Sequence, residues 1–193
     1  MLYIKWIENE RRKIYMKTTV LDNILSEKEL FYVYNQIISS SDWKLNGLSG
    51  PDRGFMSSPV LMTKEYNNSV THYPFFLWGQ TLVYRIAKLL ENKNIGIPTT
   101  VERMWFNATY HGKKTQHWLH RDDEQDLKLK SILLFMTPIW QPEWRGSFYV
   151  DGEEFKFKPG SAVIFDSKEY HKGESPASET YNWQRICCNI IVG

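Results

Sequence analysis

Histidines and one closely spaced aspartate are the residues of this 193-residue chain whose types and spacing suit metal binding. His120 and Asp122 are separated by one residue, and side chains at positions i and i+2 of a β-strand point the same way. One metal ion could therefore contact both. His117 has the opposite parity, so we expect the third ligand elsewhere, and His171 is the best candidate because it lies between two strand-like segments.

Two imidazoles and one carboxylate on one side of a metal, with the other positions open, form the facial triad that holds non-haem Fe(II). The spacing of His120 and Asp122 is not specific by itself. An alternative is a surface histidine beside a solvated loop, because Arg121 and the acidic residues that follow form a charged run. The triad is thus a hypothesis that needs support from a fourth residue.

Arg185 provides that support. It lies fourteen residues after His171, inside an apolar run that also holds Trp183, Ile186 and Ile190. An arginine in such a strand is costly unless it meets an anion, and a guanidinium binds a carboxylate through two parallel hydrogen bonds. A dicarboxylate such as 2-oxoglutarate would chelate the metal with one end and meet Arg185 with the other. A salt-bridged arginine at a sheet edge remains the alternative.

The elements that must position these residues follow from local patterns. Ser26 and Glu29 form a capping box before a helical repeat, which predicts a helix over about 27–39. A second helix is expected after Pro74, ending around 92–96, and residues 44–70 read as a long loop with an optional short strand. From Pro98 on, turn residues separate strand-like runs at 101–108, 131–136, 147–150, 154–157, 161–165 and 182–191. The order predicts an α+β fold whose second half is a sandwich or jelly roll.

Composition excludes several classes of protein. A net charge of +2 argues against a dedicated binder of nucleic acid or anionic membranes. The 10 Phe, 8 Trp and 11 Tyr suit a β-rich core or a flat-walled pocket. Cys187 and Cys188 have no metal-binding or disulfide spacing, and no apolar run would span a bilayer. We therefore expect a cytoplasmic protein, with residues 1–15 as an extension and 16–193 as one domain. Its oligomeric state is not indicated.

In these motifs the chain resembles the Fe(II)/2-oxoglutarate oxygenases, specifically the prolyl-4-hydroxylase-like branch. The ordered motif H-x-D, then His, then Arg is similar to His120, Asp122, His171 and Arg185. Four further segments are similar to family patterns and occur in the family's order, namely 20–26, Tyr110 with Gly112, 135–148 and 158–165. The resemblance extends from about residue 20 to the end and is strongest over 101–191.

The resemblance implies a double-stranded β-helix (jelly roll) with N-terminal helices packed on its major sheet. It implies Fe(II) held by His120, Asp122 and His171, with 2-oxoglutarate and O₂ as co-substrates and ascorbate as a possible reductant. Arg185 would bind the far carboxylate of 2-oxoglutarate, and Tyr110 and Asn107 would hydrogen-bond the co-substrate. The expected reaction is hydroxylation of a C–H bond in an amino acid, a peptide or another small substrate. The loop 44–70 and the segment 113–119 would overhang the metal, and the candidate substrate contacts are Arg53, Trp118, Arg121 and Arg145.

Three positions depart from the family pattern. Phe135 replaces a tyrosine, Arg145 replaces the first glycine of a pair, and the interval from His171 to Arg185 is longer than usual. Asp122 is retained, which favours oxygen insertion over the chlorination of related halogenases. Two other classes stay open from the sequence. One is a cupin-like metal enzyme with the same triad but no 2-oxoglutarate, and the other is a non-catalytic jelly-roll binding module.

Overall fold

The computed structural model describes residues 18–40, 57–58, 73–109, 119–123, 125, 128–177 and 184–193. The predicted extension 1–15, most of the predicted loop 44–70 and the segment 113–118 lie outside these residues. So do the candidate site residues Arg53, Tyr110 and Trp118. The prediction of one domain over 16–193 therefore stays a prediction.

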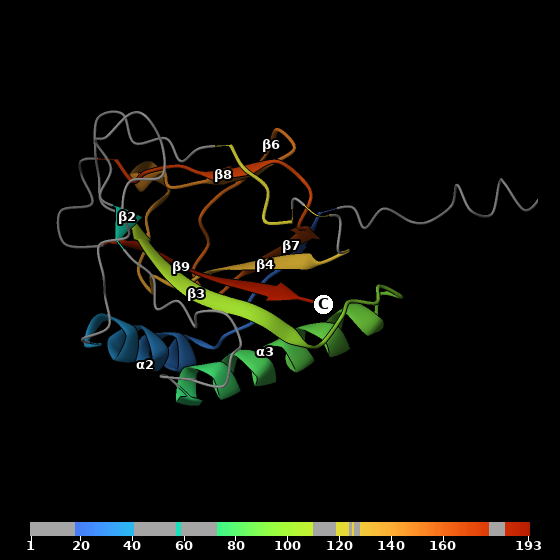
Figure 1. The fold of residues 1–193 in the computed structure, drawn as a ribbon. Helices are drawn as coiled ribbons and strands as arrows, with labels where there is room; N and C mark the ends of the chain where they lie inside the picture. The colour runs from blue at the N-terminus through green and yellow to red at the C-terminus, as the bar shows by residue number, and fades with distance from the viewer. Residues whose placement is uncertain are drawn as a thin grey trace, which may run out of the picture.

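The described chain forms two antiparallel sheets and two helices (Figure 1). The larger sheet has the strand order β1-β7-β4-β9-β3-β2, and the smaller has the order β6-β5-β8. Strand bounds are β1 Thr19–Leu21, β2 Ser57–Ser58, β3 Val101–Thr109, β4 Lys130–Phe135, β5 Phe148–Val150, β6 Glu153–Phe155, β7 Ala162–Asp166, β8 His171–Gly173 and β9 Arg185–Val192. The helices are α2 (Glu27–Ile38) and α3 (Tyr73–Glu91), and a short 3-10 helix, η1, covers Pro142–Trp144.

Both helices cover one face of the larger sheet (Figure 1). The capping box begins α2 as predicted: the Ser26 hydroxyl accepts from the Glu29 N–H at 3.3 Å, and the Glu29 carboxylate accepts from the Ser26 N–H at 2.9 Å. Residues at helical spacing then turn inward. They pack with alternate residues of the sheet into one core, which includes Leu30, Val33, Ile37, Leu82, Ile86, Leu90, Met104, Phe106, Ile132, Leu134, Ile164 and Ile190.

A second core fills the space between the two sheets. Strand β4 shows how one sequence builds both cores, because Ile132 and Leu134 face the helices whereas Leu133 and Phe135 face the smaller sheet. This alternation follows from the two-residue period of a strand. The remaining members of the second core are Phe148, Val150, Phe155, Phe157, Val163, Phe165 and Cys187. The candidate metal ligands lie on this same side of the larger sheet.

Most predicted elements are confirmed. The helix predicted over 27–39 and the one predicted after Pro74 correspond to α2 and α3, although α3 already begins at Tyr73. All six predicted strands are present with shifted bounds, and β2 is the short strand allowed for in the loop. The sequence missed β1 and β8, which have three residues each. The general α+β prediction is thus confirmed, although β1 precedes α2 and β2 lies between the two helices.

No helix within the described ranges is long and apolar enough to cross a membrane.

An ion pair links α2 to α3 and makes stability depend on pH. Arg85 Nη2 lies 2.9 Å from Glu29 Oε1, and Arg85 Nη1 also donates to the Ile24 carbonyl. Hydrogen bonds from Arg85 and from the Ser26 N–H lower the pKa of Glu29 from 4.5 to about 2. Because the pKa is lower in the folded chain, the stabilisation is fully present above pH 4.5 and is lost as pH falls through about 2.

We predict that Glu29→Gln lowers the free energy of unfolding by about 1 kcal/mol at neutral pH, because the two side chains are 42% and 41% exposed and solvent screens the pair. The difference from wild type should shrink as pH falls from 4.5 towards about 2. Urea unfolding followed by circular dichroism across this range measures it. A difference that grows with acidity would contradict the assignment.

Candidate metal centre

His120 and His171 are joined through their backbones. The His120 N–H donates to the His171 carbonyl at 3.0 Å, and the His171 N–H donates to the His120 carbonyl at 2.9 Å. This reciprocal pair is an isolated antiparallel bridge at the first residue of β8. Residues paired in this way carry their side chains on the same side of the sheet. The two imidazole centroids are accordingly only 4.2 Å apart.

Asp122 completes a group of three potential metal ligands. One ligand atom from each of His120, Asp122 and His171 can be chosen so that all three lie within 4.8 Å of one another. His120 Nε2 is 3.8 Å from Asp122 Oδ1, and His171 Nε2 is 3.5 Å from Asp122 Oδ2. The three residues predicted from the sequence are therefore brought together, although two of them are far from the third along the chain.

The sequence was right about the convergence and wrong about its local cause. His120 and Asp122 were expected to share one face of a continuous strand. Instead His120 forms a single bridge and Asp122 lies in a bend. Asp122 is placed by its N–H, which donates to the Ser167 carbonyl at 2.9 Å, and the Asp123 N–H donates to the same oxygen at 3.0 Å. A turn anchored on Ser167 thus replaces the strand.

The tautomer of His171 suits metal binding through Nε2. Its Nδ1 lies 3.0 Å from the Glu169 carbonyl oxygen, which can only accept, so Nδ1 carries the proton. Nε2, the atom nearer Asp122, then presents its lone pair. Metal-binding histidines are commonly oriented by such a bond from the other ring nitrogen.

A chain of hydroxyl groups orients the Asp122 carboxylate. The Ser131 hydroxyl donates to Asp122 Oδ2 at 2.7 Å. Ser131 Oγ is also 2.8 Å from Ser167 Oγ, and since its only proton goes to the carboxylate, Ser167 is the donor in that bond. Burial raises the pKa of Asp122, but the hydrogen bond and charge of His171, with Ser131 and His120, outweigh burial and hold the pKa below its ordinary value. The carboxylate is therefore ionised, as a metal ligand must be.

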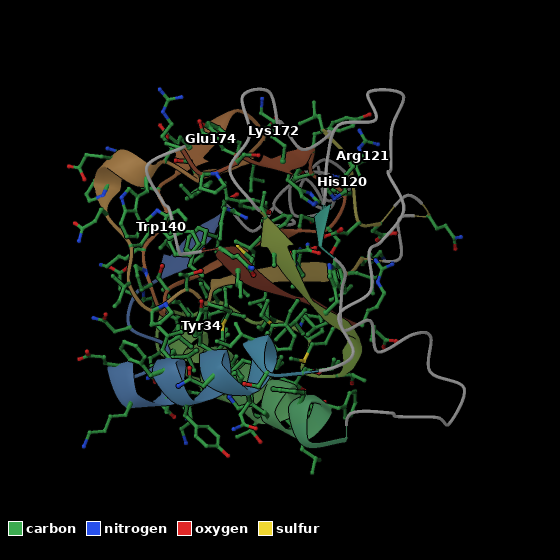
Figure 2. The ribbon with its side chains drawn as sticks, turned by 90° about the vertical axis from the view of Figure 1, so that its left-hand side faces the viewer. Tyr34, His120, Arg121, Trp140, Lys172 and Glu174 are labelled. Atoms are coloured by element: carbon green, nitrogen blue, oxygen red, sulfur yellow. The ribbon has the colours of Figure 1, made fainter. Side chains whose placement is uncertain are left out.

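Within the described part of the chain, the exposed member of the group is His120. The His120 side chain is 52% exposed, whereas those of Asp122 and His171 are 10% and 5% exposed. The rings of Phe148 and Phe165 pack against His171 at centroid distances of 5.6 and 4.9 Å. Figure 2 shows His120 on the side of the larger sheet opposite the helix layer that contains Tyr34. A ligand reaching a metal here would enter past His120, with apolar walls behind it.

Arg185 is buried between the sheets with one nitrogen left without a partner. It is 2% exposed and begins β9. Nε donates to the Gly146 carbonyl at 2.6 Å, and the guanidinium carbon lies 6.0 and 5.7 Å from the ring centroids of Phe135 and Phe157. Nη2 is buried without a hydrogen-bond partner among the described residues. A buried cationic donor left in this state strongly favours an anionic ligand.

The turn that holds Arg185 requires glycine. Gly146 has a φ of +81°, and a Cβ there would lie 3.1 Å from Arg185 Cδ and 2.9 Å from Trp140 Cζ2. Arg145, at the position where the resembling pattern has a glycine, also has a positive φ of 57°. This is a backbone region that a non-glycine residue rarely adopts. Arg145 lines a pocket of about 280 Å³ with Trp140, Pro142, Ser147, Tyr149, Glu154, Lys156, Phe157 and Glu174, and no member of the metal group lines it.

Two other candidates lie among the described residues. Asn107 pairs with Cys187 in the register of β3 and β9, on the face that points between the sheets, and its contact with a co-substrate stays a prediction. The Arg121 guanidinium carbon lies 4.0 Å above the Tyr170 ring. Arg121 is adjacent in sequence to two members of the metal group, and its guanidinium makes a cation–π contact with the Tyr170 ring.

Sequence reasoning missed Ser131, Ser167 and the carbonyl of Glu169. Ser131 reads as an ordinary strand residue, and Ser167 and Glu169 read as turn residues. Each acts through the fold by orienting Asp122 or His171. A backbone carbonyl carries no sequence signal, so Glu169 could not have been found from its residue type.

Comparison with known proteins bears on the fold of the chain. No family model and no curated protein matches the sequence. Solved structures match well despite low identity. A Pseudomonas putida prolyl-4-hydroxylase superposes with a TM-score of 0.59 at 14% identity, covering 91% of each chain. A Trichoplax adhaerens prolyl hydroxylase, in complex with a hypoxia-inducible factor peptide, gives 0.60 at 14% identity, covering 98% of this chain and 92% of that one.

A third structure extends the comparison beyond hydroxylases. The epimerase SnoN, in complex with Fe³⁺, α-ketoglutarate and nogalamycin RO, has a TM-score of 0.63 at 10% identity, covering 98% of this chain and 83% of that one. The chain therefore has the fold of the Fe(II)/2-oxoglutarate-dependent oxygenases. The resemblance drawn from the sequence motifs is confirmed at the level of the fold.

We predict that Ser131→Ala weakens binding of Fe(II), or of Mn(II) as an air-stable substitute, by about 10- to 100-fold, the usual effect of losing a residue that orients a metal ligand. The variant leaves all three ligand atoms present but removes the donor to Asp122. Isothermal titration calorimetry of the metal-free protein measures it. Ser161→Ala is the matched control, because its buried hydroxyl bonds the Lys158 carbonyl and not a metal ligand. Equal metal affinity in both variants would contradict the prediction.

Proposed function

We propose that the protein is an Fe(II)/2-oxoglutarate-dependent dioxygenase that hydroxylates a C–H bond of an amino acid, a peptide or another small substrate, with release of succinate and CO₂. The observation that carries the proposal is the pairing of two features on one face of the larger sheet. These are the His120, Asp122 and His171 group and the buried, partly unpartnered Arg185.

The donor set fits the metal. Two imidazoles and an ionised carboxylate suit Fe(II) and leave positions for other ligands, which a closed structural site would not. His120, Asp122 and His171 would hold the ion, and the iron with its keto acid would supply the oxidising chemistry. The part of the chain is to orient the ligands, through Ser131 and the Glu169 carbonyl, and to keep water from the aromatic side of the site.

The buried cation fits a dicarboxylate co-substrate. Arg185 would bind the far carboxylate of 2-oxoglutarate through its unpartnered Nη2, and its Nε is already fixed by Gly146. Phe135, in place of the family tyrosine, brings an aromatic ring and no hydroxyl to this end, so the arginine bears more of the anchoring. Asn107 and Tyr110 complete the co-substrate contacts in this proposal.

The two sheets support a finer description of the fold. We infer that they form the double-stranded β-helix, or jelly roll, with α2 and α3 packed on the major sheet and 16–193 as a single domain. A cytoplasmic location is part of the same proposal. A 2-oxoglutarate-independent metal enzyme or a binding module would leave the buried Nη2 of Arg185 without a function.

The function is tested by anaerobic titration of the apo-protein with Fe(II) and then with 2-oxoglutarate. We expect an absorption band that requires both components, because the keto acid chelates the metal through two oxygens. Asp122→Ala should abolish the band. Asp151→Asn is the control, since it changes an exposed carboxylate in the β5–β6 turn and should leave the band intact. A wild-type protein that shows no such band is not an enzyme of this class.

We also predict that Arg185→Leu raises the dissociation constant for 2-oxoglutarate by about 100-fold, within the range for losing buried hydrogen bonds to a charged group. Metal affinity should stay within about twofold of wild type, because among the described residues Arg185 is held by the Gly146 carbonyl and not by a candidate metal ligand. The band titration gives the first value and calorimetry gives the second. An Arg185→Leu variant that binds 2-oxoglutarate normally would show that the co-substrate does not reach this residue.

A further inference from the structure

Strand β9 presents a row of four side chains to the space between the sheets. Cys187 belongs to the core between the sheets, whereas Cys188 and Ile190 belong to the core beneath the helices. Because side chains alternate along a strand, Arg185, Asn189 and Ile191 lie on the same face as Cys187. Arg185 and Asn189 are therefore two polar groups on one face, about 14 Å apart along the strand at ~3.4 Å per residue.

The metal group lies at the Ile191 end of this row. Ile191 pairs with Ser131 on one side and with Arg103 on the other. Ser131 donates to the Asp122 carboxylate, and Arg103 Nη2 donates to the Asp122 carbonyl at 3.3 Å. In this row Asn189 is the neighbour of Ile191, and Arg185 is at the opposite end. A co-substrate stretched from the metal group to Arg185 would run along β9 and pass over Asn189.

Asn189 carries a donor without an acceptor. Its side-chain Nδ2 is buried and has no hydrogen-bond partner among the described residues, a condition it shares only with Arg185 Nη2 within that part of the chain. Its register neighbours, Trp105 on β3 and Leu133 on β4, supply no side-chain acceptor. A buried amide left in this state destabilises the fold unless a ligand accepts from it.

We propose that Asn189 is a positioning residue whose Nδ2 donates to the metal-binding end of the keto acid, at its carboxylate or keto oxygen. This inference rests on the proposed function. The two unpartnered donors on β9 then bind opposite ends of the co-substrate. Arg185 binds the far carboxylate, and Asn189 binds the end that chelates the metal. Cys187, between them, faces the chain of the keto acid with a thiol whose pKa is raised by burial, so it stays neutral there.

Two probes separate the ends of the site. 2-Oxoglutarate reaches from the metal to Arg185, whereas oxalate chelates a metal and has no far carboxylate. In anaerobic Fe(II)-loaded protein, the absorption band that requires both Fe(II) and 2-oxoglutarate gives the dissociation constant of 2-oxoglutarate directly. Loss of this band as oxalate displaces 2-oxoglutarate gives the dissociation constant of oxalate. Both values are binding constants and need no turnover and no identified substrate.

Asn189→Leu, which keeps the size and removes the donor, should raise the dissociation constants of 2-oxoglutarate and oxalate by about 10-fold or more each, as expected for one hydrogen bond to a charged acceptor. Arg185→Leu should weaken 2-oxoglutarate and leave oxalate within about twofold. Ile190→Val is the control, because it alters the adjacent residue on the helix side of β9 and should change neither constant.

Asn189→Asp is a second variant that keeps the inference testable if Asn189→Leu does not fold. Aspartate has the same shape as asparagine, but its negative charge would face the keto-acid oxygen that is proposed to accept from Asn189. The dissociation constants of 2-oxoglutarate and oxalate should therefore rise further than in Asn189→Leu. Unchanged oxalate binding in a folded Asn189 variant would overturn the inference, even if 2-oxoglutarate binding changed. A wild-type protein without the band would overturn the proposed function and this inference with it. A normal wild-type band with unaffected Asn189 variants would overturn the inference alone.

Discussion

Two backbone hydrogen bonds between His120 and His171 are the constraint on which the rest of the site depends. They bring a residue from the segment before β4 against the first residue of β8, so that the imidazoles lie 4.2 Å apart. Backbone hydrogen bonds fix the separation of the two backbone segments independently of side-chain rotamers. Asp122 then needs only a short turn, anchored on the Ser167 carbonyl, to enter the same space.

The second requirement is a dry interior that still contains polar groups. The space between the sheets is lined by Leu133, Phe148, Phe165 and similar side chains, yet it also holds Arg185 and Asn189. Buried donors without acceptors are rare in folded proteins because each lowers stability. Their placement on one face of β9, at separate distances from the metal group, is explained if one extended anionic ligand satisfies both. In this account, part of the stability of the fold is given up to make the binding site.

The sequence predicts the elements whose causes are local. Ser26 and Glu29 start α2 through contacts within one helical turn, and alternating residues define β4 and β9. It fails where pairing with a distant segment decides the outcome. Strand β8 has three residues and contains Gly173, so nothing in its own sequence indicates a strand. The bridge at His120 exists only because β8 is there to receive it.

The same distinction holds for the site. His120, Asp122, His171 and Arg185 could be predicted because their residue types are costly or unusual in a strand-rich region. Ser131 and Asn189 could not, because small polar residues are common in strands and become informative only when their partners, or the lack of them, are seen. The strand argument predicted that His120 and Asp122 lie together, which they do, but its geometry was wrong, since a bend places Asp122.

The proposed function requires that three side chains from two segments hold one iron and that the keto acid bound to it reaches the buried Arg185. Anomalous diffraction at the iron absorption edge, from crystals grown anaerobically with Fe(II) and 2-oxoglutarate, tests it most directly. We expect one peak per chain within bonding distance of His120, Asp122 and His171, with the far carboxylate of the keto acid at Arg185. A peak bound by other residues, or a keto acid that leaves Arg185 unpaired, would contradict it.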